Sequence, residues 1–127
     1  MNAGEDHEGG LNKLTEGVIG AAYAVHNALG FGFLEKVYEN SLAHELRKRG
    51  FVVEQQVGCP VRYDGRVVGE YVSDLVVEGR VLVELKAIRE LDDAHLAQCL
   101  NYLAATGLPL CLLINFGRRV TVKRIRR

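Results

Sequence analysis

The segment VLVELKAI combines an apolar run typical of a buried strand with two opposite charges, Glu84 and Lys86. Side chains alternate between the two faces of a strand, so Glu84 and Lys86 share one face, and Val83 and Leu85 share the other. A further carboxylate, Asp74, lies in the preceding apolar segment EYVSDLVVEG. Two carboxylates buried on neighbouring strands repel each other unless a cation lies between them. Hard oxygen ligands of this kind suit Mg²⁺ or Mn²⁺.

The length of the turn between the two strands decides whether the two carboxylates share a face. A two-residue loop places Asp74 and Glu84 on opposite faces. A three-residue loop Val77–Gly79 instead pairs Asp74 with Leu82 and places both carboxylates on the face of Lys86. The glycine at the third loop position favours this longer turn, because that position requires a positive φ. The alternative is that Glu84 and Lys86 form an ion pair on a half-exposed strand, with Asp74 near an edge.

The elements that must position these residues follow from periodicity and from turn signals. Apolar spacing and glycine stops predict helices over 11–29, 34–49 and 92–106, with Asp92 or Asp93 as the last N-cap. Strands are expected over 51–57, 70–77, 81–87, 110–115 and 119–125, and a hairpin over 61–68 around Asp64-Gly65. This order indicates an α/β or α+β domain with a mixed sheet.

Length and composition indicate an ordinary globular domain. The 127 residues suit a single domain over 11–127, after an acidic, Gly-rich stretch over 1–10 that we expect to be disordered. The 16 Lys and Arg balance the 16 Asp and Glu, so the total charge does not point to a polyanionic partner. The basic C-terminal stretch GRRVTVKRIRR suits either contacts with phosphates or a charged edge strand.

The remaining composition favours a cytoplasmic protein without a membrane segment. Cys59, Cys99 and Cys111 are widely spaced among apolar residues, with no zinc-ligand spacing, so we expect buried free thiols in a reducing compartment. No apolar stretch approaches the length of a membrane span, and no secretory signal opens the chain.

Asp74 followed by Glu84-Leu85-Lys86 resembles the metal-binding core of the PD-(D/E)xK nuclease superfamily. The segment GFLEKVY, residues 32–38, fits the GxxExxY signature that names a small family within it, and QCLNY resembles the QxxxY element of several exonuclease-like branches. Ser73 stands where the first motif often has proline. The resemblance implies a restriction-endonuclease-like αβββαβ core, with a mixed central sheet flanked by helices.

The resemblance also implies roles in phosphodiester hydrolysis. Asp74, Glu84, the backbone carbonyl of Leu85 and Glu35 are the expected ligands of one Mg²⁺ or Mn²⁺ ion. Lys86 is expected to orient or activate a water molecule and to contact the phosphate. The alternative for Glu35 is a position on the helix surface.

Further site residues are expected from the two motifs on helices. Gln98 and Tyr102 are four residues apart and share a helix face, so both are expected to assist catalysis and contact substrate. Tyr38, one turn after Glu35, is a candidate for substrate binding. The alternative for both tyrosines is a buried ring with its hydroxyl reaching a polar partner.

Three classes of function remain open. The first is a metal-dependent nuclease acting on DNA, in repair or in the processing of foreign DNA. The second is a protein of the same fold that binds nucleic acid or a partner without cutting, and the third is an interaction module. A small domain of zero net charge has weak non-specific affinity for DNA, which favours a protein partner or a homo-oligomer.

Overall fold

In the computed structural model, the backbone is described for residues 3–127 and the side chains from residue 9 onward. The chain forms three helices and five strands within these residues. Their order is α1 (Ala3–Leu29), α2 (Glu35–Lys48), β1 (Val53–Tyr63), β2 (Arg66–Val77), β3 (Val81–Lys86), α3 (Asp93–Thr106), β4 (Leu110–Phe116) and β5 (Val120–Arg126).

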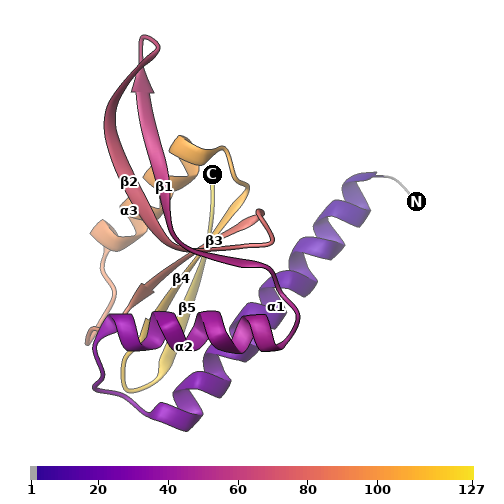
Figure 1. The fold of residues 1–127 in the computed structure, drawn as a ribbon, viewed down its shortest axis with the longest axis vertical. Helices are drawn as coiled ribbons and strands as arrows, with labels where there is room; N and C mark the ends of the chain where they lie inside the picture. The colour runs from indigo at the N-terminus through magenta and orange to yellow at the C-terminus, as the bar shows by residue number, and fades with distance from the viewer. Residues whose placement is uncertain (1–2) are drawn as a thin grey trace.

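The five strands form one mixed sheet in the order β1-β2-β3-β4-β5. The central pair β3 and β4 is parallel, and the other three pairs are antiparallel. Helix α3 connects the parallel strands as a crossover, as parallel neighbours require. The expected mixed sheet flanked by helices is therefore confirmed (Figure 1).

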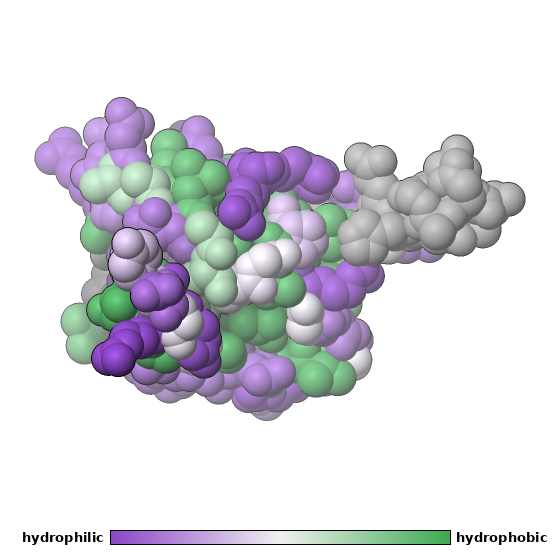
Figure 2. Space-filling view, turned by 90° about the horizontal axis from the view of Figure 1, so that it is seen from above, coloured by the Kyte–Doolittle hydropathy of each residue, from purple (hydrophilic) through white to green (hydrophobic). Residues whose placement is uncertain are grey.

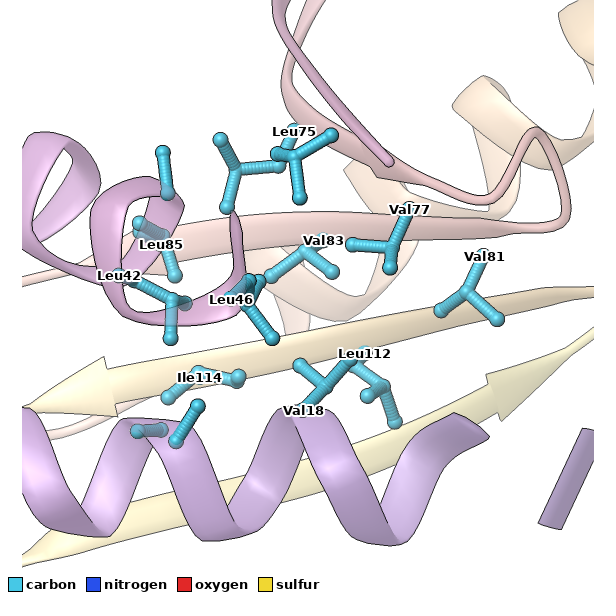
Figure 3. Packing of buried hydrophobic residues seen from close by; sticks show 14 of the residues in the cluster. Val18, Leu42, Leu46, Leu75, Val77, Val81, Val83, Leu85, Leu112 and Ile114 are labelled. Carbon is cyan, nitrogen blue, oxygen red and sulfur yellow. The ribbon is translucent and has the colours of Figure 1, made fainter. Parts of the chain in front are cut away.

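Helices cover both faces of the sheet, because the central strands are apolar on both sides. Val81, Val83 and Leu85 of β3 face α1 and α2 and join the larger core cluster. Figure 3 shows Leu85 and Val83 near Leu42 and Leu46 of α2, with Val81 farther away on the right. Leu82 points the other way, into a smaller cluster with Cys99, Tyr102 and Leu103 of α3. By this alternation, Glu84 and Lys86 belong to the α3 side of β3.

Strands β1 and β2 are longer than expected. The strands predicted over 51–57 and 70–77 merge with the hairpin predicted over 61–68, giving two long strands around the Asp64-Gly65 turn. Asp64 and Gly65 have φ of 52° and 74°, as a tight hairpin turn requires. This hairpin projects beyond the rest of the sheet (Figure 1). Viewed from above, the surface mixes hydrophilic and hydrophobic residues (Figure 2).

Helix α1 begins at Ala3, so the expected start near residue 11 is corrected, and the tail predicted over 1–10 overlaps the helix. The first two residues of that predicted tail lie outside the described residues. All three cysteines are free and buried, as expected. Within the described part of the chain, no helix is long and apolar enough to cross a membrane.

Candidate active site

The turn between β2 and β3 places the two carboxylates opposite each other. The loop has three residues, as the same-face arrangement requires, but it comprises Glu78–Arg80 rather than Val77–Gly79. Val77 pairs with Val81, so continuing the register opposes Asp74 to Glu84. The predicted pairing of Asp74 with Leu82 is therefore wrong by two positions. The face shared by the two carboxylates is unchanged, because side chains alternate with a period of two.

Where β2 and β3 separate, hydrogen bonds to the two carboxylates take the place of hydrogen bonds between the two backbones. The last backbone pair in this direction is Leu75 with Val83. Beyond it, the Asp74 N–H donates to Oε1 of Glu84 at 3.1 Å, and the Leu85 N–H donates to Oδ2 of Asp74 at 2.8 Å. Each strand therefore holds the carboxylate of the other. This exchange fixes both side chains at the opening between the strands.

The pairing of β2 with β1 is also interrupted at Asp74. Gln55 pairs with Leu75, and Val57 pairs with Ser73, but the intervening residue Gln56 has a φ of 54° and is left out of the ladder. The Gln56 amide instead approaches Oδ1 of Asp74 at 3.5 Å. A positive φ in a residue other than glycine is uncommon and often marks a functional site. Asp74 therefore lies at a break on both sides of its strand.

Burial raises the pKa of both carboxyl groups. The pKa of Glu84, which is only 4% exposed, rises to about 8, first because of burial and second because of the charge of Asp74. Burial likewise raises the pKa of Asp74, and the hydrogen bond from Leu85 partly offsets this effect. The apo site thus disfavours two negative charges. A divalent cation would reverse this preference.

Helix α2 adds two acidic residues to the site. Burial and the charge of Asp74 raise the pKa of Glu35 in the first turn, while Lys86 lowers it. Glu35 is half-buried and therefore does not lie on the fully exposed face of the helix. Glu39, one turn later, is only 3% exposed and forms an ion pair with Lys36 at 3.1 Å.

Glu39 and the two glutamines of β1 were missed by the sequence analysis. Gln55 and Gln56 each donate to a different oxygen of Glu39 at 2.7 Å. Because Gln56 also reaches Asp74, it connects α2 to the carboxylate pair. The available signal was the four-residue spacing of Glu35 and Glu39, which places both on one helix face.

Lys86 contributes a positive charge that affects the acidic residues Glu35 and Asp74. It ends β3, is partly exposed, and its charge lowers the pKa of both Glu35 and Asp74. By strand alternation, its side chain lies on the same face of β3 as Glu84. The alternative of a simple pair between Glu84 and Lys86 is not what the structure contains, because Glu84 is held by the backbone of Asp74.

The two tyrosines predicted to act at the site are buried. Burial and, second, the charge of Glu84 raise the pKa of Tyr102, and its ring packs edge-on against Tyr71, with the centroids 5.3 Å apart. The hydroxyl of Tyr38 donates to the Gly30 carbonyl at 2.6 Å, and its ring stacks on Phe116. Tyr38 thus supports the loop before α2 rather than offering a surface to substrate. Gln98, one turn before Tyr102, is partly exposed.

The donor set fits a hard divalent ion bound by few protein ligands. Among the described residues, no three His, Cys, Asp or Glu side chains are already gathered to hold a metal. Glu35 is therefore not part of a preformed three-carboxylate site. Asp74 and Glu84 remain as the two carboxylates that would hold an ion. Mg²⁺ is commonly held by one or two carboxylates, with water and substrate phosphate completing its shell.

A mixed sheet with paired carboxylates and a lysine where two central strands separate defines a restriction-endonuclease-like protein. One solved structure with this fold is an alkaline exonuclease, LHK-Exo, from Laribacter hongkongensis, with a TM-score of 0.51 and 15% identity. The match covers 67% of this chain and 52% of that chain.

The match to a protein family covers more of the chain than the match to the solved structure. The family model described as the PD-(D/E)XK nuclease superfamily matches residues 12–127, so this chain belongs to that superfamily. The search of curated proteins gives no match.

Proposed function

We propose that this protein is a divalent-metal-dependent nuclease that hydrolyses phosphodiester bonds in DNA. The observation that carries the proposal is the exchange of hydrogen bonds between Asp74 and the β3 strand. It holds the buried carboxylate of Glu84 and the half-buried carboxylate of Asp74 side by side where β2 and β3 separate, two residues before Lys86 at the end of β3. Membership of a nuclease superfamily and the fold of an exonuclease support the same conclusion.

Asp74 and Glu84 are the residues that would hold the ion, and the Leu85 carbonyl is a possible third protein ligand. When bound, Mg²⁺ or Mn²⁺ would supply Lewis-acid polarisation of the phosphate and a more acidic water. Lys86 supplies positive charge next to the phosphate and orients the attacking water. Gln56 positions Asp74 by a direct hydrogen bond, and Glu39 in turn holds the Gln56 amide.

We also place the chain in the GxxExxY group of the superfamily. Each motif residue has a local role that supports this assignment. Gly32 has a φ of +105°, which suits glycine. Burial and the charge of Asp74 raise the pKa of Glu35, and Tyr38 supports the loop before α2. The motif residues thus shape the loop before α2 and place Glu35 in the first turn of that helix.

The test is a cleavage assay on labelled single- and double-stranded DNA and RNA, with Mg²⁺, Mn²⁺ or EDTA. We expect DNA cleavage that requires the metal. Asp74→Asn, Glu84→Gln and Lys86→Ala should each lower the rate by at least about 100-fold, as loss of a charged catalytic group commonly does. Glu16→Gln and Lys13→Ala, at exposed positions of α1, are the matched controls and should cleave like the native protein.

Two outcomes contradict the proposal. Cleavage that persists in EDTA would exclude a metal-dependent reaction. A folded native protein that is inert on every substrate would favour the non-cleaving alternative.

A further inference from the structure

The loop before α2 presents two aromatic rings to solvent. Phe31 and Phe33 are 58% and 48% exposed. Two of the four phenylalanines in the chain therefore do not contribute to the core. Their neighbour Leu34 is 79% exposed. Large apolar side chains gathered in one loop are a common mark of a binding surface.

The loop that carries these rings is fixed in place. The Tyr38 hydroxyl donates to the Gly30 carbonyl at 2.6 Å and receives a longer hydrogen bond from the Phe33 N–H at 3.4 Å. The Tyr38 ring also meets Phe33 edge-on, with centroids 6.2 Å apart. The exposed rings are therefore held ready for contact rather than ordered on binding, which lowers the entropy cost of binding.

Arginines surround the same loop. The Arg118 guanidinium carbon lies 5.3 Å from the centroid of the Phe31 ring, close enough for a cation–π contact. Arg89 and Arg119 are exposed nearby and line a cavity of about 810 Å³ together with Arg118. The turn after β4 and the segment after β3 thus place Arg118 and Arg89 beside the aromatic rings, with Arg119 in the adjoining cavity.

This surface borders the candidate active site. A cavity of about 420 Å³ is lined by Phe31, Phe33 and Arg118 and also by Glu35 and Ala87, the residue after Lys86. In Figure 1, the end of β3, the start of α2 and the turn between β4 and β5 gather at the lower left. The cavity therefore reaches Glu35 and the residue after Lys86, at the border of the candidate active site, and is not itself lined by Asp74 or Glu84.

We propose that Phe31, Phe33 and Arg118 bind a short single-stranded segment of nucleic acid and lead it to the Asp74–Glu84 site. Exposed rings accept unpaired bases by stacking, and arginines accept the phosphates between them. Duplex bases are stacked inside the helix and cannot use these rings. The inference rests on the proposed nuclease function and defines its substrate class as single-stranded ends or regions.

The test measures binding by fluorescence anisotropy in EDTA, so it does not depend on cleavage. The probes are a labelled single-stranded DNA oligonucleotide and a blunt duplex of the same sequence. For Phe31→Ala, we expect the single-strand Kd to rise roughly 5- to 150-fold, the range for loss of one stacked base. Phe31→Tyr keeps an aromatic face and should bind like the native protein. Tyr63→Ala, an exposed ring at the hairpin tip, is the matched control.

Arg118→Ala should weaken single-strand binding and reduce the slope of log Kd against log salt concentration by about 0.7, as loss of one phosphate contact to a single strand does. A single-strand Kd that is unchanged in Phe31→Ala overturns the proposal. So does an equal loss of duplex affinity, because stacking on unpaired bases would then not be involved. Failure of the nuclease function would appear separately, as an inert protein that still binds the single strand.

Discussion

The carboxyl group of Glu84 couples the stability of this protein to pH. Its pKa rises from an ordinary value of 4.5 to about 8, chiefly through burial and then through the charge of Asp74. The folded state therefore binds this proton more tightly than the unfolded state does. The resulting stabilisation is fully present below about pH 4.5 and is lost as the pH rises through about 8.

In EDTA, we accordingly expect the free energy of unfolding to fall by on the order of 3 kcal/mol between pH 5 and pH 8.5. Glu84→Gln should flatten this dependence, because the amide does not titrate. Urea denaturation across the pH range measures it, with Glu16→Gln as the control. Curves of equal slope for the native protein and Glu84→Gln would contradict this assignment.

Stabilisation of the protein by bound Mg²⁺ should have the opposite pH dependence and increase with pH. The ion requires deprotonated carboxylates, so binding releases protons and is favoured at high pH. We expect millimolar Mg²⁺ to raise the melting temperature clearly at pH 8.5 and little at pH 5. Asp74→Asn should abolish the effect. Equal stabilisation at both pH values would place the ion elsewhere on the protein.

At the scale of elements, α3 has a complete N-terminal cap. Asp92 accepts hydrogen bonds from the Ala94 N–H at 2.9 Å and the His95 N–H at 3.2 Å. In return, Nδ1 of His95 accepts from the Asp92 N–H at 3.0 Å. This cap fixes where α3 begins after the β3 strand. It also gives His95 a structural role.

Asp92→Ala should therefore destabilise the protein by about 1 kcal/mol, the usual loss for an N-cap. Asp93→Ala, at the next position, removes a similar charge without removing the capping hydrogen bonds and should cost less. Urea denaturation in parallel compares the two. Equal losses would mean that the helix dipole, rather than the cap, accounts for the effect of Asp92.

At the scale of the whole molecule, stability is unevenly distributed along the sheet. The central strand β4 is buried along its entire length, whereas the hairpin tip around Asp64 is exposed. Residues with few buried contacts open with little free-energy cost, and central strands open only with the whole domain. The projecting hairpin and the central strands should thus behave as separate parts of one domain.

Hydrogen–deuterium exchange followed by mass spectrometry checks this distribution. We expect amides of β4, from Cys111 to Ile114, to be the slowest and to exchange only on global unfolding. Amides from Arg62 to Val68 should exchange several orders of magnitude faster. Similar protection of both segments would show that the hairpin is covered in solution, for example by a second copy of the chain.

The sequence by itself determined the order of helices and strands, the class of fold and the residues Asp74, Glu84 and Lys86. These follow from short-range rules: side-chain alternation, helical periodicity and glycine stops. It also indicated that a shared metal site requires a β2–β3 turn of odd length, because only an odd loop puts both carboxylates on one face. The assignment of Asp92 as a possible cap had the same local origin.

Only the tertiary structure decided how distant segments meet. It showed that Asp74 lies opposite Glu84, that Gln56 leaves the ladder, and that Glu39 is held by two glutamines of β1. It also showed that the loop at Phe31 meets the turn at Arg118. These contacts join residues far apart in the chain and depend on strand register and helix packing, which local patterns do not specify.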